Sequence, residues 1–356
     1  MNTIKVLVVD DSALMRKLLT ELLNADPGIE VVGAAMDAYV AREMIKRLNP
    51  DVLTLDVEMP KMDGISFLSN LMRLRPMPVI MVSTLTEKGA AVTCQALEIG
   101  AVDFVEKPKF DVAHALEDYS AEIITKVKVA ARARVDKLVR PTSPQTGGAQ
   151  PVVAKLNYST TDKVIAIGAS TGGTEAIKDV LMGLPPDVPG IVITQHIPPV
   201  FSRSFAERMN QVTPLTVHEA VDGQQIRPGH AYVAPGGLHL SVVRDGAKYA
   251  CRIDDSEPVN RHKPSVDVLF ESVANAVGNN AVGVILTGMG KDGALGQRSK
   301  REAGAKTNDQ DKETCDDRGM PRAAVDVGGA ESVKPLGEIA DEIQHKLASL
   351  DCARAS

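Results

Sequence analysis

The sequence predicts an α/β protein of two domains, each built on a parallel sheet. Three observations support this prediction. The chain has 356 residues, about twice the usual size of a single domain. Short aliphatic runs alternate with amphipathic segments in both halves, and the halves are separated by "PTSPQTGGAQP", a composition typical of linkers. We therefore expect an N-terminal domain over residues 1–136, a linker over 137–161 and a C-terminal domain over 162–350.

The N-terminal half contains short aliphatic runs, each followed by a segment with helical periodicity. In chain order the runs are "IKVLVV", "VVGAA", "VLTL", "PVIMVS" and "AVDFV". Strict alternation of strands and helices implies βαβ units, in which helices cover both faces of a parallel sheet. The N-terminal domain is therefore predicted to be a five-stranded parallel sheet of the flavodoxin-like type.

The C-terminal half continues the same alternation. Its clearest strands are "KVIAIGAS", "GIVITQHI", "HAYVAPG" and "AVGVILTG", and several of them end in glycine or polar residues where a helix is expected to begin. Functional groups in open α/β sheets gather at the carboxyl ends of the strands. We expect a doubly wound, Rossmann-like and mostly parallel sheet with a site at that edge.

The composition argues against several classes of function. The net charge is -6, there is no Trp and only 3% of residues are aromatic, so binding to nucleic acid is not expected. No apolar stretch approaches the roughly 20 residues that span a bilayer, and the N-terminus lacks a signal-peptide pattern. We expect a cytoplasmic protein without membrane insertion. The four cysteines are scattered singly, which favours neither a zinc site nor a disulfide framework.

Polar residues follow the predicted strands of the N-terminal domain. In chain order they are Asp10 and Asp11, Asp56, Ser83 and Lys107. Taken singly, each has an ordinary structural explanation, such as a helix cap or a turn. Three carboxylates at one edge of a parallel sheet, however, predict a Mg²⁺ site. A phosphoryl group on Asp56 would find the cation, Lys107 and the Ser83 hydroxyl around it.

Four stretches of this half resemble the receiver domain of bacterial response regulators in order and spacing. They are "VLVVDDSALMR", "DVLTLDVEMPKMDG", "VIMVSTLT" and "GAVDFVEKP". The resemblance implies that Asp56 accepts a phosphoryl group from a histidine kinase, with Asp10 and Asp11 helping it to hold Mg²⁺. It also implies that Ser83 and Phe104 respond to phosphorylation.

The segment "VIAIGASTGGTEAI", residues 164–177, leads from a predicted strand through a glycine-rich turn into a predicted helix. Ser170 in this turn has three explanations. It could cap the helix, or the turn could bind a nucleotide, although "GASTGG" lacks both G-x-G-x-x-G and the Walker lysine, and the match "GMGKDG" at 288–293 stands alone. The third explanation makes Ser170 a nucleophile.

A nucleophilic serine needs a base and an orienting acid at the same sheet edge. His196 ends the strand "GIVITQH", and Asp292 lies in the turn after "AVGVILTG". His196 would take the Ser170 proton during attack on an acyl carbon, and Asp292 would orient the imidazole. The helix start at Thr171 and the turn at Met289 are candidate supports of the developing oxyanion. A structural histidine and a turn aspartate are the ordinary alternatives.

Five stretches of the C-terminal half are similar to the catalytic domain of chemotaxis protein-glutamate methylesterases, the CheB family. They are "IAIGASTGGTEAI", "ITQHIPPVFSRSFAERMN", "PGHAYVAPGGLHL", "PVNRHKPSVDVLF" and "VGVILTGMGKDGALG". The resemblance implies that Ser170, His196 and Asp292 form a triad. This triad would hydrolyse glutamyl methyl esters on chemoreceptors to glutamate and methanol, deamidate receptor glutamines, and need no cofactor. With a receiver in front, the activity is expected to be gated by phosphorylation.

A basic cluster lies in the stretch "PVNRHKPS". Arg261, His262 and Lys263 carry charges that suit an acidic receptor helix. A solvated turn is the alternative. We take these three residues as candidates for receptor docking.

One segment departs from the family pattern. After "GALG" the family has an apolar helix face and an apolar strand, whereas residues 297–318 are rich in charge and contain no large aliphatic side chain. The residues at expected core positions are Asn308, Asp309, Asp316, Asp317 and Arg318. Because burying an unpaired charge costs several kcal/mol, we expect the segment to be exposed or rearranged, or to destabilise the domain near Asp292. The alternative function is therefore a non-enzymatic, phospho-regulated signalling adaptor.

Overall fold

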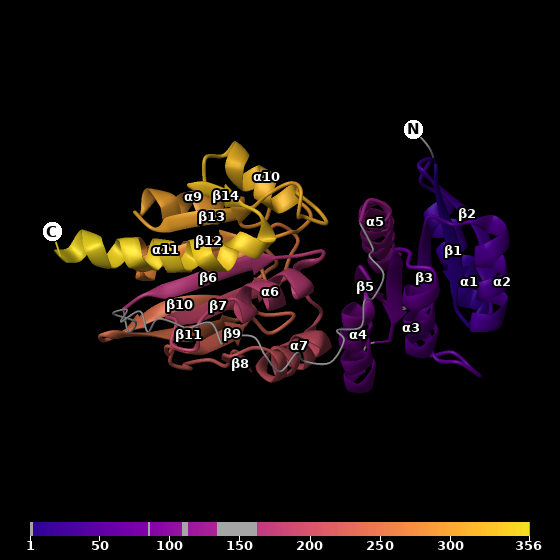
Figure 1. The fold of residues 1–356 in the computed structure, drawn as a ribbon, viewed down its shortest axis with the longest axis horizontal. Helices are drawn as coiled ribbons and strands as arrows, with labels where there is room; N and C mark the ends of the chain where they lie inside the picture. The colour runs from indigo at the N-terminus through magenta and orange to yellow at the C-terminus, as the bar shows by residue number, and fades with distance from the viewer. Residues whose placement is uncertain (1–2, 85, 109–112, 134–161, 356) are drawn as a thin grey trace, which may run out of the picture. The chain divides into compact units, whose positions relative to one another are not determined.

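The computed structural model describes residues 3–84, 86–108, 113–133 and 162–355. The chain divides into two compact units, residues 1–146 and 147–356 (Figure 1). The linker that we predict over 137–161 lies outside the described residues, so its bounds stay a prediction. Within the described ranges, none of the helices combines the length and the apolar composition needed to cross a bilayer.

The described part of the N-terminal unit alternates five strands with five helices. They are β1 (Ile4–Val9), α1 (Ala13–Asn24), β2 (Ile29–Ala35), α2 (Ala38–Leu48), β3 (Val52–Asp56), α3 (Gly64–Leu74), β4 (Val79–Ser83), α4 (Glu87–Ile99), β5 (Asp103–Glu106) and α5 (Ala113–Ala130). All paired strands are parallel, in the order β2-β1-β3-β4-β5. This arrangement confirms the predicted flavodoxin-like sheet and places the carboxyl ends of β1 and β3 side by side.

The local sequence sets where these helices begin and which face they bury. Side chains accept hydrogen bonds from first-turn N–H groups at the starts of α1 to α4, and they belong to Ser12, Asp37, Asp63 and Thr86. Such caps satisfy donors that have no partner inside the helix. Val6 and Val8 of β1 share one buried cluster with Leu19 of α1 and Ile123 of α5, because alternate residues of a strand point to the same face.

The C-terminal unit is built on a larger sheet. Its elements are β6 (Val164–Ala169), α6 (Gly173–Met182), β7 (Gly190–Gln195), α7 (Pro199–Val212), β8 (Thr216–Glu219), β9 (His230–Val233), β10 (His239–Asp245), β11 (Lys248–Asp254), α8 (Val266–Ala276), the 3₁₀ helix η1 (Gly278–Asn280), β12 (Ala281–Ile285), α9 (Ala294–Glu302), β13 (Lys306–Gln310), α10 (Gly319–Asp326), β14 (Ser332–Lys334) and α11 (Leu336–Ala355). The seven-stranded sheet is parallel, in the order β14-β13-β12-β6-β7-β9-β8, and β10 and β11 form a separate antiparallel hairpin. The predicted mostly parallel, doubly wound sheet is confirmed.

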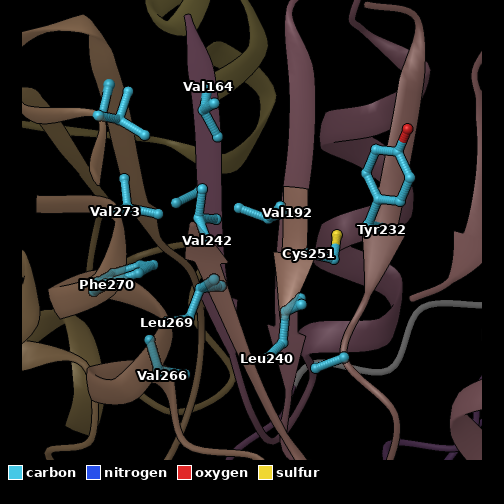
Figure 2. Packing of buried hydrophobic residues seen from close by; sticks show 14 of the residues in the cluster. Val164, Val192, Tyr232, Leu240, Val242, Cys251, Val266, Leu269, Phe270 and Val273 are labelled. Atoms are coloured by element: carbon cyan, nitrogen blue, oxygen red, sulfur yellow. The ribbon is translucent and has the colours of Figure 1, made fainter. Parts of the chain in front are cut away.

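The hairpin and α8 cover one face of this sheet with a single apolar cluster. Figure 2 shows Val192 of β7 and Tyr232 of β9 beside Val242 of β10 and Leu269 and Phe270 of α8. Each of these side chains is at most 2% exposed, and burying one such side chain contributes about 1.5–3 kcal/mol. The packing fixes α8 against the sheet, so the first turn of α8 has a defined position at the sheet edge.

The charge-rich segment is buried over part of its length. The residues at most 1% exposed include Gln297, Lys300, Thr307, Asn308, Asp309 and Gln310. Our expectation that the segment would be exposed or rearranged is therefore wrong for β13 and for Gln297 and Lys300 of α9, whereas Arg298, Arg301 and Glu302 of α9 are exposed. The physical reason is backbone pairing: β13 lies between β12 and β14 in a regular parallel register, so its side chains enter the interior whatever their polarity. Asp316 and Arg318, in the following loop, are exposed as expected.

Four of these residues form what we call the buried polar cluster: Gln297, Lys300, Asn308 and Asp309. The Gln297 amide donates to Asp309 Oδ1 at 2.7 Å, and Lys300 Nζ lies 2.9 Å from the centre of the Phe270 ring. Burial lowers the pKa of Lys300 well below its usual value. Burial also raises the pKa of Asp309 to about 7, although the Gln297 hydrogen bond and the Lys300 charge oppose this. Both groups are therefore shifted toward their neutral forms.

Candidate active site

The strand order of the C-terminal unit places the three predicted triad residues at one sheet edge. β12, β6 and β7 are neighbours, and Ser170 and His196 directly follow β6 and β7, whereas Asp292 lies in the loop between β12 and α9. The chain starts this sheet at β6 and extends it to both sides, so a topological switch point lies beside β6. Switch points are where open α/β sheets form their sites.

The turn that carries Ser170 packs closely against the turn after β12. Ser170 N donates to the Thr287 carbonyl at 3.0 Å, and a Cβ on Gly288 would lie 2.8 Å from Ser170 Cβ, so only glycine allows this approach. Gly172, which has a φ of 74°, is the N-cap of helix α6, and the cap has no side-chain hydrogen bond. The helix-cap explanation of Ser170 is therefore wrong, and its half-buried hydroxyl is left for other chemistry.

His196 and Asp292 form a buried pair. His196 Nε2 lies 2.8 Å from Asp292 Oδ2, and the two side chains are 9% and 0% exposed. His196 Nδ1 is also buried and has no hydrogen-bond partner among the described residues. Because Asp292 engages Nε2, Nδ1 is the nitrogen that can take a proton from Ser170. Hydrogen bonds between a nucleophile and its base are often long until substrate binds.

Asp292 is held ionised by several donors. Asn260 Nδ2 and Ser265 Oγ donate to Oδ1 at 2.8 Å and 2.7 Å, and the Val266 N–H, at the start of α8, donates to Oδ2 at 2.7 Å. Burial acts to raise the pKa of Asp292. The hydrogen bond and the charge of His196, together with hydrogen bonds from Asn260 and Ser265, outweigh burial and hold that pKa well below its usual value. An ionised Asp292 can stabilise a protonated His196.

Three residues of this site were missed by the reading of the sequence. Gln195 donates to the carbonyls of Ser170 at 2.7 Å and His196 at 3.2 Å, and it lies buried at the end of β7. A polar side chain ending an aliphatic run was an available signal for Gln195. Ser265 directly precedes a helical pattern, which is a capping signal. Asn260 carries no comparable signal, because its contact to Asp292 depends on the folded loop.

The remaining predicted site residues of this unit are placed as follows. Thr171 is buried at the start of α6, and its carbonyl accepts a hydrogen bond from Thr287 Oγ1 at 3.0 Å. Met289 is half-buried in the loop after β12. Arg261 is exposed, and Lys263 forms an ion pair with Asp255. The oxyanion roles and the docking roles of these residues stay predictions.

The loop after β13 lines the Ser170 turn. The Asp317 carbonyl accepts from Gly288 N at 2.9 Å, and Asp317 N donates to Thr287 Oγ1 at 3.0 Å. The Asp316 carboxylate lies against Gly172, where any added Cβ would collide with it. An acidic side chain therefore lies beside the turn that carries Ser170.

The N-terminal unit brings its predicted carboxylates together. One oxygen from each of Asp10, Asp11 and Asp56 lies within 4.8 Å of the others. Lys107 Nζ lies 3.2 Å from Asp10 Oδ2 and 2.8 Å from Asp56 Oδ2. Three carboxylates at this spacing are the hard oxygen donors that Mg²⁺ prefers, so the residues fit the predicted cation. Ser83 is buried at the end of β4.

The electrostatic environment of this cluster favours a positively charged group beside the carboxylates. Burial raises the pKa of Asp56 to about 6, the neighbouring Asp10 carboxylate adds to this effect, and Lys107 opposes it. The pKa of Lys107 is raised, because its hydrogen bonds and charge interactions with Asp56 and Asp10 outweigh its own burial. Phe104, on β5, is 5% exposed. The responses predicted for Ser83 and Phe104 stay predictions.

Comparison with known proteins identifies both units. The family model described as CheB methylesterase matches residues 165–343, and the model described as response regulator receiver domain matches residues 6–117. The chain is 58% identical to protein-glutamate methylesterase/protein-glutamine glutaminase 1 of Xanthomonas campestris pv. campestris over 344 residues, 96% of each chain. It is 56% identical to the protein-glutamate methylesterase/protein-glutamine glutaminase of Nitrosomonas europaea over 349 residues, 98% of this chain and 97% of the relative.

A solved structure agrees with the C-terminal assignment. The crystal structure of the Thermotoga maritima CheB methylesterase catalytic domain is 37% identical, with a TM-score of 0.50, and the match covers 51% of this chain and 97% of that one. The region of similarity contains Ser170, His196 and Asp292 within the family-model match. The chain belongs to the CheB methylesterase family, with a response regulator receiver domain preceding the catalytic domain.

Proposed function

We propose that this protein hydrolyses glutamyl methyl esters of chemoreceptors to glutamate and methanol, deamidates receptor glutamines, and is activated by phosphorylation of Asp56. The observation that carries the proposal is the buried 2.8 Å contact between His196 Nε2 and Asp292 Oδ2, at the strand end next to Ser170. Relatives that share more than half of the sequence are named for both reactions, methylesterase and glutaminase.

The geometry supports an acyl-enzyme mechanism. Ser170 Oγ attacks the ester carbon while His196 Nδ1 takes its proton, and Asp292 stabilises the imidazolium that forms. The tetrahedral oxyanion would be met by N–H groups at the start of α6, near Thr171. The imidazolium then returns the proton to the departing methoxide, which leaves as methanol. Water attacks the acyl-enzyme with His196 again acting as base, and this step restores Ser170 and releases the glutamate carboxylate.

The same groups account for deamidation. A glutamine side chain presents an acyl carbon of the same shape, and the imidazolium would protonate the amine so that ammonia leaves in place of methanol. The product is again a glutamyl acyl-enzyme, which water hydrolyses to glutamate. One site could therefore catalyse both of the reactions for which the relatives are named.

The receiver would supply the control. Asp10, Asp11 and Asp56 would hold Mg²⁺, which when bound neutralises charge on an incoming phosphoryl group. Lys107 already contacts Asp56 and Asp10, so it is positioned to pair with a phosphoryl oxygen on Asp56. We propose a histidine kinase as the phosphodonor, in keeping with the receiver fold, and chemoreceptors as the substrates.

Methanol release tests this function. On methylated receptor membranes, we expect release by the folded protein that rises about 5- to 150-fold when Mg²⁺ and a small-molecule phosphodonor are added, the range of an allosteric coupling of roughly 1–3 kcal/mol. Asp56→Asn should abolish the rise. A rate of methanol release that does not change with the phosphodonor contradicts activation by phosphorylation. A folded protein that releases no methanol contradicts the proposed esterase activity.

The alternative of a non-enzymatic adaptor is not favoured. Relatives at 58% identity over 96% of the chain are named as enzymes, and the buried polar cluster does not displace the contact between His196 and Asp292. Labelling with an organophosphonate separates the two functions further. Modification of Ser170 that is lost in His196→Ala supports the enzyme, and an inert Ser170 supports the adaptor.

A further inference from the structure

A four-residue turn after β11 lies against the buried pair. Val259 and His262 exchange two backbone hydrogen bonds, with N–O distances of 3.1 Å and 2.9 Å. The two central residues, Asn260 and Arg261, have φ values of 53° and 68°. Positive φ at both central positions defines a type I′ turn, and asparagine adopts this region more readily than most residues. The two hydrogen bonds hold the first and last residues of the turn together, so the backbone that carries the side chains of Asn260 and His262 has a defined position.

This turn contacts both the acid and the base. The Asn260 amide donates to Asp292 Oδ1 at 2.8 Å and to Asp267 Oδ2 at 2.7 Å. The His262 ring stacks on the His196 ring, with centroids 3.7 Å apart and planes 12° from parallel. The acid and the base of the proposed triad are therefore each held by a side chain of the same turn.

Stacking of His262 on His196 restricts a rotation of the His196 ring that the hydrogen bond to Asp292 does not prevent. A single contact at Nε2 fixes one atom of the His196 ring, and the ring can still rotate about that contact, because the terminal torsion of histidine is broad. Rotation of this kind would swing Nδ1 away from Ser170. A parallel ring at 3.7 Å blocks the rotation, since the His196 edge would collide with the His262 face.

We infer that His262 is a positioning residue for the ester hydrolysis proposed above: its stacked ring holds the plane of His196 so that Nδ1 faces Ser170. The inference rests on that proposed function. A protonated His262 would repel the imidazolium that forms during the reaction, whereas a neutral His262 would not. Asp292 contacts His196, Asp267 contacts Asn260 of the same turn, and Arg261 and Lys263 flank His262 in the sequence.

The test compares two substrates and three variants of the full chain. The substrates are methylated receptor membranes and a small γ-methyl ester of blocked glutamate, which has no receptor surface to dock. His262→Ala removes the ring, and His262→Phe keeps a flat ring without nitrogen atoms. The matched control is His230→Ala, which removes one ring of another stacked histidine pair, His218 and His230, whose centroids lie 5.3 Å apart on β8 and β9.

We expect His262→Ala to lower kcat on both substrates by about 10- to 100-fold, the cost of a misplaced catalytic group, with little change in KM. His262→Phe should recover most of this loss, because it restores the stacking face, and it should remove any contribution of His262 protonation from the pH profile of kcat. His230→Ala should behave like the parent. A His262→Ala variant that raises KM for receptor membranes and leaves kcat on the small ester unchanged overturns the inference in favour of docking.

A readout besides turnover keeps the inference separate from the function on which it rests. In ¹⁵N-labelled full-length protein, His262→Ala should broaden the His196 imidazole signals, and His262→Phe should do so less. Unchanged His196 signals in His262→Ala overturn the positioning role. A parent protein that hydrolyses neither substrate overturns the proposed function, and the His196 signals then still decide whether His262 positions the ring.

Discussion

Ser170→Ala and His196→Ala should each reduce ester turnover by about 10⁴- to 10⁶-fold, and the double variant should be barely slower than either. Residues of a triad act as one unit: without Ser170 there is no nucleophile, and without His196 Nδ1 there is no base to activate it. The buried contact between His196 and Asp292 supports the pairing of the base with the acid in the proposed unit. Initial rates of methanol release from the small ester and from receptor membranes measure the three variants.

Two controls complete this first prediction. Thermal unfolding must show that the variants remain folded, because His196→Ala removes one partner of a buried carboxylate, Asp292. Organophosphonate labelling of Ser170 should disappear in His196→Ala while the serine is still present. Losses that add in the double variant mean that the two residues do not cooperate, and the mechanism proposed for them is then wrong.

Replacing the ionisable members of the buried polar cluster should stabilise the catalytic domain. Lys300 and Asp309 are 0% exposed, and burying such groups costs more than their mutual attraction returns. Exchange of buried ionic groups for apolar ones of similar volume is often stabilising by about 1–4 kcal/mol. We expect a gain of that size for the double variant Lys300→Met, Asp309→Leu at pH 7.

The pH dependence of this gain follows from the two pKa shifts. The pKa of Lys300 is lowered in the folded protein, so the unfolded chain binds more protons up to about pH 10.4, and stability rises with pH across that window. The pKa of Asp309 is raised to about 7 in the folded protein, so the folded chain binds more protons between about pH 4 and that value, and stability falls as pH rises there. The two contributions place a stability minimum near neutral pH, and the double variant should lose it.

Pulsed thiol labelling of Cys251 in urea measures this prediction within one domain. Cys251 is 0% exposed and lies in the core of the C-terminal unit, so its modification, located by peptide mass spectrometry, reports unfolding of that unit. Lys306→Met is the matched control, since Lys306 belongs to the same segment but forms a half-exposed pair with Glu331. Such pairs contribute about 0–1 kcal/mol. A double variant no more stable than the control contradicts the prediction.

Much of the fold could be predicted from the sequence because the same alternation of strand and helix patterns recurs along both halves of the chain. Aliphatic runs that alternate with helical patterns define both sheets, and polar residues at strand ends predict sites at Ser170, His196 and Asp56. The hairpin of β10 and β11 was not predicted, although its two-residue loop begins at Gly246, which has a φ of 59°, and glycine at the first position of such a loop is a hairpin signal.

What could not be predicted depends on contacts between distant segments. Local polarity favoured exposure of Asn308 and Asp309, but strand pairing with β12 and β14 buries them. His262 was read as a surface charge for docking, and its stacking on His196 arises from a turn 66 positions later in the chain, which no local pattern reveals. Which nitrogen of His196 faces Asp292 likewise became clear only from the folded loop.

The polar side chains of β13 have a consequence for aggregation. β14 forms one edge of the seven-stranded sheet and has only three residues, paired to β13 alone, so local opening at this edge would expose β13 before any other strand. An exposed apolar edge recruits strands from other chains, and charged or polar residues are a common natural defence against such pairing. With Asn308, Asp309 and Gln310 on the newly exposed strand, the opened form offers a poor template. Asp309, which we expect to lower the stability of the catalytic domain, would thus help to keep its partly opened state soluble.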